Sequence, residues 1–276
     1  TAVGTFSNLD NQPTYWPTNN SGLWLQNATV GGSANSGWYK NQSSSWTSSG
    51  LTSNSSYTFQ ARSRNGDAVA NAFTGDTNVI TLMDAPTGIS WGTVTLTSIE
   101  AKPTAPSWGW NNLTVGSSGL KTTNTTTSAT SGWIQTSGFW NSTPLAINTQ
   151  YDFSAVARNQ SAIETATVTG SKWTLIETPT GLTVGTYGVT TATLTPQGSF
   201  SNLTSGSSGI RVVNSTQGGA HNSGWMTTVS SWTDTQVNAN NVVNYYVTAR
   251  NGEGVETSQQ TAQVTTLIES PTSVTF

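Results

Sequence analysis

One short segment is written three times along this chain of 276 residues. The copies begin at Tyr57, Tyr151 and Val243, and each ends in an Arg-Asn pair. Within each copy aromatic or apolar residues alternate with polar ones, which predicts a half-buried antiparallel strand. The copies start 94 and 92 residues apart. A fixed internal period of this length indicates a chain built as an array of like modules.

Other landmarks keep the same interval. A Ser-Gly-Trp tripeptide recurs, and a second tryptophan follows each copy after a short gap. These tryptophans are Trp38, Trp133 and Trp225, followed by Trp46, Trp140 and Trp232. An acid-x-Pro-Thr sequence closes each copy, and its prolines stand 93 and 92 residues apart at Pro86, Pro179 and Pro271. We therefore predict three modules, at residues 1–83, 84–176 and 177–268, followed by a terminal strand at residues 269–276.

The composition narrows the class of protein. Charged residues make up 8% of the chain, against roughly 25% in ordinary globular proteins. The 12 Trp, 7 Tyr and 7 Phe supply core anchors that a disordered polar tract lacks. With a net charge of −3 and scattered basic residues, nucleic acid and anionic membrane surfaces are poor partners. No apolar run approaches the roughly 20 residues of a membrane span. The Ser/Thr/Asn-rich, charge-poor surface favours an extracellular or cell-surface protein.

The first copy of the repeat resembles a known family. Leu51, a short polar turn, Tyr57, an alternating strand and the Asn65-Gly66 pair are similar to the E–F turn, strand F and F–G turn of a fibronectin type III domain. The Pro-Thr-Gly-Leu182-Thr-Val184 sequence is similar to strand A of that family. The resemblance implies a seven-stranded sandwich, and no helical stripe competes with it. We predict an all-β chain of three tandem fibronectin-III-like β-sandwich modules.

The modules are out of phase with the ends of the sequence. Residues 1–9 align best with residues 191–203, so the first module is predicted to start at strand B and to lack strand A. Residues 271–276 align with the strand A sequences and are predicted to form a spare strand A. An incomplete sandwich exposes unpaired backbone and an open groove. The predicted groove residues are Val3, Phe6 and Leu9, and the predicted donor residues are Pro271, Val274 and Phe276.

Two interpretations of this mismatch stay open. In the first, the tail of one copy fills the groove of the next by donor-strand complementation, a head-to-tail contact that polymerises. In the second, the sequence is a segment of a longer tandem array. The leading hypothesis is a structural subunit of an extracellular filament, sheath or surface layer whose partners are copies of itself.

Catalytic and metal-binding chemistry is not predicted. The chain has one histidine and no cysteine, and its 12 acidic residues form no Asp-x-Asp-x-Asp loop. No phosphate-binding glycine loop opens a helix, so no cofactor is predicted. We expect no catalytic residues, no metal ligands and no enzymatic activity.

Tryptophans suggest an alternative function. The repeated ones are expected to pack in the cores or to stack against the repeated arginines, Arg64, Arg158 and Arg250. Trp173 is also expected in a core. Four others lie in loops particular to one copy and are expected to form contact surfaces, to stack on sugar rings or to pack in a local core: Trp16, Trp24, Trp108 and Trp110. The alternative is therefore a carbohydrate-binding or adhesin accessory array of a secreted protein, with glycans as partners.

Asn-x-Ser/Thr sequons indicate possible N-glycosylation, although a chain this rich in Asn, Ser and Thr contains many by chance. The candidate asparagines are Asn19, Asn27, Asn41, Asn54, Asn112, Asn124, Asn141, Asn159, Asn202 and Asn214.

Overall fold

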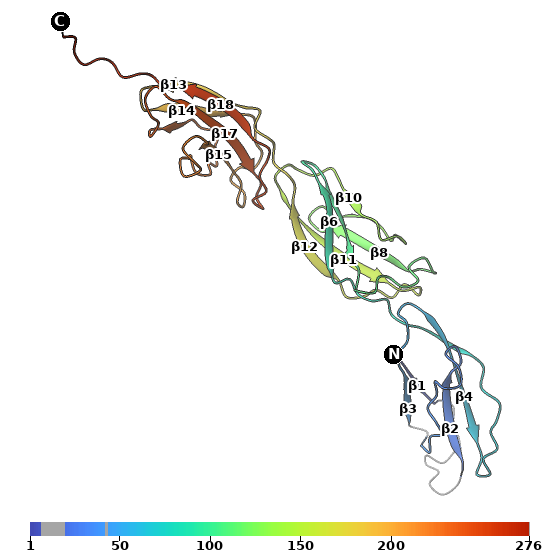
Figure 1. Cartoon of the computed structure of the whole chain (residues 1–276). Coiled ribbons are helices and arrows are strands. Elements are labelled where there is room, and N and C mark those ends of the chain that lie inside the picture. The colour runs from blue at the N-terminus through green and yellow to red at the C-terminus, as the bar shows by residue number, and fades with distance from the viewer. Residues whose placement is uncertain (7–19, 42–43, 276) are drawn as a thin grey trace.

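The computed structural model describes residues 1–6, 20–41 and 44–275. The described residues form β-strands and loops without a helix, arranged as three sandwiches in a row, with the two ends of the chain far apart (Figure 1). We call the sandwich of β1–β5 module 1, that of β6–β12 module 2, and that of β13–β18 module 3. The predicted all-β fold of tandem β-sandwich modules is confirmed.

Module 3 packs two antiparallel sheets of three strands each. Its first sheet has the order β13-β14-β16, with β13 at Gly181–Tyr187, β14 at Ala192–Gln197 and β16 at Trp232–Asp234. Its second sheet has the order β15-β17-β18, with β15 at Gly209–Asn214, β17 at Val242–Arg250 and β18 at Gln260–Thr265. The repeated segment is β17, the central strand of the second sheet.

Module 2 repeats this plan with one added strand. Its first sheet has the order β10-β7-β6, with β6 at Gly88–Val94, β7 at Ile99–Thr104 and β10 at Trp140–Ser142. Its second sheet has the order β12-β11-β8-β9, with β8 at Gly119–Asn124, β9 at Ala129–Thr130, β11 at Gln150–Arg158 and β12 at Val168–Trp173. We call the first strand of each complete module strand A, which is β6 in module 2 and β13 in module 3. The letters B, C, E, F and G denote β14, β15, β16, β17 and β18 of module 3 and their counterparts in the other modules.

Module 1 has a smaller first sheet. That sheet contains two strands in its described part, β1 at Ala2–Thr5 and β3 at Ser45–Ser48. The second sheet is complete in the order β2-β4-β5, with β2 at Gly22–Asn27, β4 at Ser56–Arg64 and β5 at Thr77–Ile80. Module 1 therefore has the counterparts of strands B, C, E, F and G, while the strand A position holds no described strand.

One aromatic on the repeated strand anchors each core. These residues are Phe59, Phe153 and Tyr245. Each meets the second repeated tryptophan edge to face, at centroid distances of 6.3, 6.5 and 6.3 Å for Trp46, Trp140 and Trp232 respectively. These three tryptophans pack in the cores, as the sequence predicted.

Module 3 differs from the other two in its core chemistry. The Tyr245 hydroxyl donates to the buried Asp234 carboxylate at 3.1 Å, and Asn214 Nδ2 donates to the same oxygen at 2.7 Å. Burial, reinforced by the negative charge of Asp234, raises the pKa of Tyr245 above its ordinary value. The tyrosine is thus held neutral, and its polar end is satisfied inside the sandwich.

The first repeated tryptophan stacks with cations on the outer face of the second sheet. Guanidinium carbons lie 4.3, 4.3 and 4.1 Å from the ring centroids in the pairs Arg64–Trp38, Arg158–Trp133 and Arg250–Trp225. A second cation lies within 5.3, 4.5 and 4.4 Å of the same rings, from Arg62, Lys121 and Arg211. The predicted cation–π pairs are present in all three modules. Together with the second cations they involve six of the nine Lys and Arg residues of the chain.

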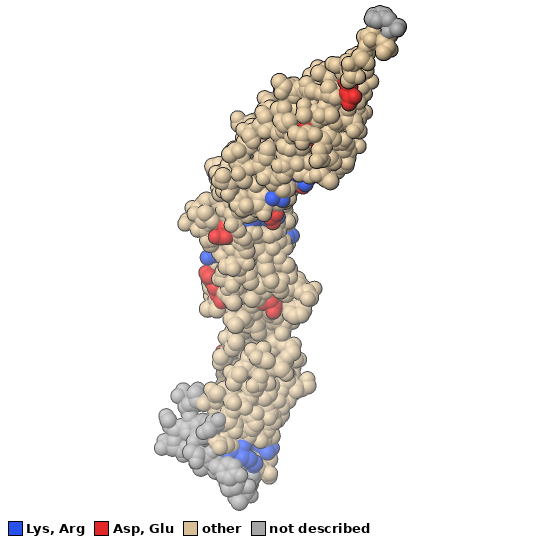
Figure 2. Space-filling view, turned by 90° about the vertical axis from the view of Figure 1, so that its left-hand side faces the viewer, with Lys and Arg blue, Asp and Glu red and all other residues tan. Residues whose placement is uncertain are grey.

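The surface is otherwise poor in charge. Figure 2 shows scattered Lys, Arg, Asp and Glu side chains on a mostly uncharged face. Across the described ranges, none of the chain forms a helix with the length and apolar character needed to cross a membrane.

Candidate functional site

Strand A occupies the same place in modules 2 and 3. In module 3, β13 pairs with β14 so that Leu182 is opposite Pro196 and Val184 is opposite Leu194. The far side of β13 lies against β18, as β6 lies against β12 in module 2. Strand A therefore closes the sandwich between strands B and G, and its apolar residues pack on the core.

The register of module 1 identifies which residues would face such a strand. Gly4 pairs with Trp46 just as Leu194 pairs with Trp232, so Gly4 is the counterpart of Leu194. Two residues further on, Phe6 is the counterpart of Pro196. Gly4 and Phe6 therefore lie on the core-facing side of β1, while Val3 alternates to the other side.

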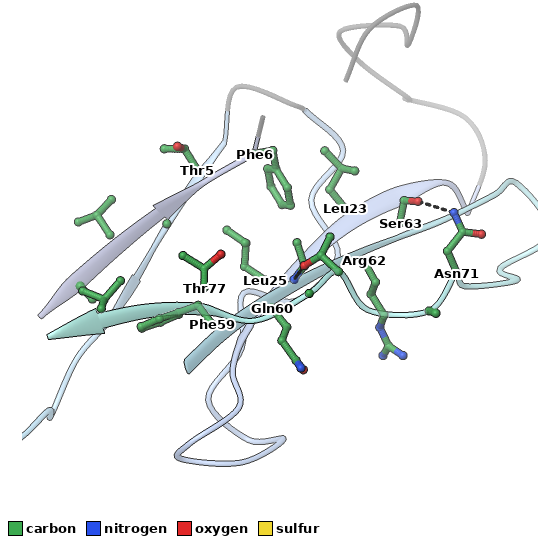
Figure 3. Close-up of a pocket in the computed structure, with 18 residues that line it drawn as sticks. Thr5, Phe6, Leu23, Leu25, Phe59, Gln60, Arg62, Ser63, Asn71 and Thr77 are labelled. Atoms are coloured by element: carbon green, nitrogen blue, oxygen red, sulfur yellow. Dashed lines mark hydrogen bonds between the residues drawn. The ribbon is translucent and has the colours of Figure 1, made fainter. Parts of the chain in front are cut away.

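A groove of about 670 Å³ occupies the strand A position of module 1 (Figure 3). We call it the acceptor groove. Its walls include β1 and the segment that leads into β5, and its apolar lining includes Phe6, Leu23, Leu25, Phe59 and Val79. Leu23 and Leu25 are buried at 4% and 6% exposure, so the groove reaches down to the core of the module.

The predicted acceptor residues differ in their placement. Phe6 is half-buried and meets Tyr39 edge to face at 6.4 Å. Val3 borders the groove but is 66% exposed, because its side chain belongs to the outer side of β1. Leu9 lies outside the described residues. Sequence analysis missed Leu23, Leu25 and Phe59, although the alternating pattern of the repeated strand already assigned Phe59 to a core face.

The predicted donor segment extends away from module 3 (Figure 1). Pro271 is exposed and Val274 is 74% exposed, and Phe276 lies outside the described residues. The segment forms no strand within residues 269–275. An isolated segment has no neighbour to complete a hydrogen-bonded ladder, which explains why the predicted spare strand is not formed here.

A buried asparagine joins module 1 to module 2. Asn54 lies in the turn between β3 and β4 and is 0% exposed. Its Oδ1 accepts the Gln160 backbone N–H at 2.9 Å, and its Nδ2 donates to Ser118 Oγ at 2.9 Å. The same Nδ2 donates to the carbonyls of Asn111 and Asn112. We call these contacts joint 1.

The same contacts recur between modules 2 and 3, as joint 2. Asn148 is also 0% exposed, and its Oδ1 accepts the Gly252 backbone N–H at 2.9 Å. Its Nδ2 donates to Ser208 Oγ at 2.9 Å and to the carbonyls of Ser201 and Asn202. The backbone φ is 50° at Asn54 and 46° at Asn148. Asparagine tolerates this left-handed conformation better than most side chains, which accounts for the residue type.

Each joint also has bonds in the reverse direction. Asn159 Nδ2 donates to the Thr81 carbonyl at 3.1 Å in joint 1, and Asn251 Nδ2 donates to the Thr174 carbonyl at 3.0 Å in joint 2. The side chains of Asn159 and Asn251 are 1% and 0% exposed. The two joints are therefore built from the same donors and acceptors, which fixes each module against the next.

Apolar contacts complete the joints. Met83 leaves module 1 and packs against Leu120 and Ala157 of module 2. Trp173 is half-buried at joint 2 and was wrongly expected in a core. Its ring lies so close to Gly252 that a Cβ there would come within 2.3 Å of it. Glycine at position 252 is required by this close approach.

The recurring linker acids bind the following module. Asp84 Oδ2 accepts the indole N–H of Trp108 at 3.1 Å, and Glu177 Oε2 accepts the backbone N–H of Ser201 at 2.9 Å. Within the described residues there is no group of three or more His, Cys, Asp or Glu side chains able to hold a metal ion.

The loop tryptophans do not form one platform. Trp108 is 71% exposed, whereas Trp110 packs against the Met83–Leu120–Ala157 cluster. Trp24 stacks on Trp38 at a centroid distance of 5.2 Å in module 1. Trp16 lies outside the described residues. Among the described three, Trp108 alone presents a largely exposed ring.

Most sequon asparagines have structural roles. Five are buried, which corrects the expectation that they carry glycans: Asn27, Asn54, Asn124, Asn159 and Asn214. A glycan on these side chains would not fit inside the fold. Asn112 and Asn202 are exposed, but their Nδ2 atoms donate across the joints to the carbonyls of Asn54 and Ile147. Asn41 and Asn141 are exposed, and Asn19 lies outside the described residues.

Comparisons with known proteins concern the fold alone. No protein-family model matches the chain, and no curated protein matches it. A two-domain fibronectin type III segment of chicken tenascin is 14% identical over 66% of this chain and 100% of its own length, with a TM-score of 0.41. The FN1–FN3 domains of chicken CNTN1 are 12% identical over 92% of this chain and 93% of theirs, with a TM-score of 0.36.

Proposed function

We propose that this chain is a structural subunit of an extracellular filament, sheath or surface layer, joined head to tail by strand addition. The observation that carries the proposal is the acceptor groove at the strand A position of module 1. An open sandwich with an unpaired strand edge is a template for a strand from another molecule. The charge-poor exterior and the repeated rigid joints also suit a load-bearing rod.

The tail of the chain is similar in sequence to strand A of module 3. Residues 271–276 read Pro-Thr-Ser-Val-Thr-Phe, against Pro-Thr-Gly-Leu-Thr-Val at residues 179–184. Val274 thus corresponds to Leu182 and Phe276 corresponds to Val184. Transferring the pairing of β13 with β14 to module 1 would place Val274 opposite Phe6 and Phe276 opposite Gly4.

The sizes of these pairs are complementary. In module 2 the large Trp91 of strand A is opposite the small Ala101. In the proposed pairing, the large Phe276 would be opposite Gly4, which has no side chain to compete for the space. Full burial of a valine or phenylalanine side chain contributes about 1.5–3 kcal/mol each.

The arrangement of the modules favours contact between copies. Module 1 and the terminal segment lie at opposite ends of the row (Figure 1). A tail that enters the groove of another copy makes a heterologous contact, and such contacts extend into filaments when they do not close a ring.

Deletion of residues 271–276 tests the proposal. We expect the full chain to form concentration-dependent oligomers and filaments in sedimentation velocity and electron microscopy, and the deletion variant to remain monomeric. Val274→Asp should have the same effect, because a carboxylate is costly to bury in an apolar groove. Thr275→Asp is the control, since residue 275 alternates away from the groove. The proposal is wrong if the deletion variant polymerises like the full chain, or if the full chain stays monomeric at every concentration.

A further inference from the structure

We infer that the junction between copies reproduces joints 1 and 2, with Asn240 of one copy bound to the Gly66 end of module 1 in the next. This inference rests on the proposed head-to-tail assembly and specifies its contact surface. Two half-sites support it, one on module 3 and one on module 1. Each matches, over its described residues, part of one side of a joint that the chain already forms twice.

Module 3 presents the first half-site. Asn240 has a φ of 47°, close to the 50° of Asn54 and the 46° of Asn148. Its backbone N–H donates to the Leu267 carbonyl at 3.0 Å, as Asn54 N–H donates to the Leu82 carbonyl at 2.9 Å. Unlike its two counterparts, Asn240 is exposed, and its amide has no partner among the described residues. The turn is therefore already in the conformation that binds a following module.

An exposed apolar residue lies beside Asn240. Ile268 is 71% exposed, whereas its counterparts Met83 and Ile176 are 4% and 3% exposed. Met83 is buried against Leu120 of module 2, and the counterpart of Leu120 in module 1 is Leu23. Leu23 lines the acceptor groove, so the half-site for Ile268 is continuous with the groove that the tail would fill.

Module 1 presents the complementary half-site. Gly66 is the counterpart of Gly252, and its backbone N–H has no acceptor within the described ranges. Asn65 Oδ1 accepts the backbone N–H groups of Asp67 and Val69, as Asn251 Oδ1 accepts those of Glu253 and Val255. The Asn65 side chain is thus held in its joint conformation, yet the residue is exposed where Asn251 is 0% exposed.

The counterparts specify the contacts across the junction. Asn240 Oδ1 would accept Gly66 N–H, as Asn148 Oδ1 accepts Gly252 N–H. Asn65 Nδ2 would donate to the carbonyl of Thr266, the counterpart of the Thr174 carbonyl that Asn251 binds. The junction would then hold two copies at the same relative orientation as two neighbouring modules.

Asn240→Gly tests the junction in the full chain. Glycine keeps the left-handed backbone conformation and removes the side-chain amide. We expect the dissociation constant for head-to-tail association to rise about tenfold, because the Gly66 N–H would lose its acceptor at a site that the junction buries. Asn141→Ala, at an exposed position on β10, is the control and should leave the constant unchanged. The thermal midpoint of each variant checks that module 3 remains folded.

The outcomes separate the junction from strand addition. If Asn240→Gly associates as tightly as the wild type while deletion of residues 271–276 abolishes association, the tail contact stands and the asparagine junction is wrong. If the wild type does not associate at all, both proposals are wrong. Filaments of the wild type should also show evenly spaced modules in electron micrographs, and a distinct spacing at every third module boundary would overturn the junction.

Discussion

Fusing residues 179–190 in front of Thr1 is expected to raise the thermal midpoint of module 1 by about 10 °C or more. The graft supplies β13 with its own turn, and it joins naturally because Thr1-Ala2 occupies the place of Thr191-Ala192. Leu182 and Val184 would enter the acceptor groove from within the same chain. Their burial contributes about 1.5–3 kcal/mol each, and such a gain shifts the midpoint of a small domain by several degrees per kcal/mol.

The graft has a matched control in the same sequence. A fusion that carries Leu182→Asp and Val184→Asp in the added strand should leave the thermal midpoint of module 1 unchanged. Hydrogen exchange of the β1 and β5 amides, measured as a function of temperature, reports the unfolding of module 1 in each fusion. The intact graft should also block head-to-tail association, because its strand occupies the groove. Equal stabilisation by both fusions would show that module 1 has no vacant strand position.

Phe153→Ala is expected to destabilise module 2 by about 3–5 kcal/mol, a large share of the stability of a single domain. Phe153 is 0% exposed and meets Trp91 and Trp140 at centroid distances of 5.2 and 6.5 Å. Its truncation would leave a closed cavity among these rings. The cost therefore includes both the lost transfer free energy and a cavity term.

Phe59→Ala in module 1 is the natural comparison. Phe59 is 9% exposed and borders the acceptor groove, so its removal widens an open space and adds little cavity term. We expect a cost of about 1.5–3 kcal/mol, close to the transfer term alone. Urea unfolding monitored module by module with hydrogen exchange measures both values. In the grafted chain the cost of Phe59→Ala should rise toward that of Phe153→Ala, and equal costs in the ungrafted chain would contradict an open core in module 1.

The fold could be predicted from sequence because several signals coincide. The alternating repeat placed Phe59, Phe153 and Tyr245 on core faces. The recurrence of one Trp and one Arg at the same positions of every repeat predicted the cation–π pairs on the outer face of the second sheet. The lack of strand A in module 1 was also predicted, since the alignment of its opening residues began at strand B, and the described residues of module 1 place no strand at that position. These features depend on local periodicity, which a single sequence displays directly.

The joints could not be predicted in the same way. Asn54, Asn148 and Asn240 recur at one phase of the repeat, but asparagine is common throughout the chain and its recurrence does not stand out. Their function depends on a left-handed turn that meets a loop of the next module, a contact between residues 60 to 106 positions apart. Several sequons were likewise misleading, because asparagine at strand ends serves hydrogen bonding inside the sandwich.

Disulfide trapping between copies tests strand addition most directly, and the absence of native cysteine makes the experiment clean. The proposed register places Thr275 of one copy opposite Thr5 of another, as Thr183 is opposite Thr195 in module 3. Opposed residues in an antiparallel pair lie about 4.5–5.5 Å apart at Cα, within disulfide range. Mixing Thr275→Cys with Thr5→Cys under mild oxidation should yield a covalent dimer of the two variants, and mixing Thr275→Cys with Val3→Cys should yield far less. Equal yields from both mixtures, or none from either, would contradict a tail strand seated in the groove of module 1.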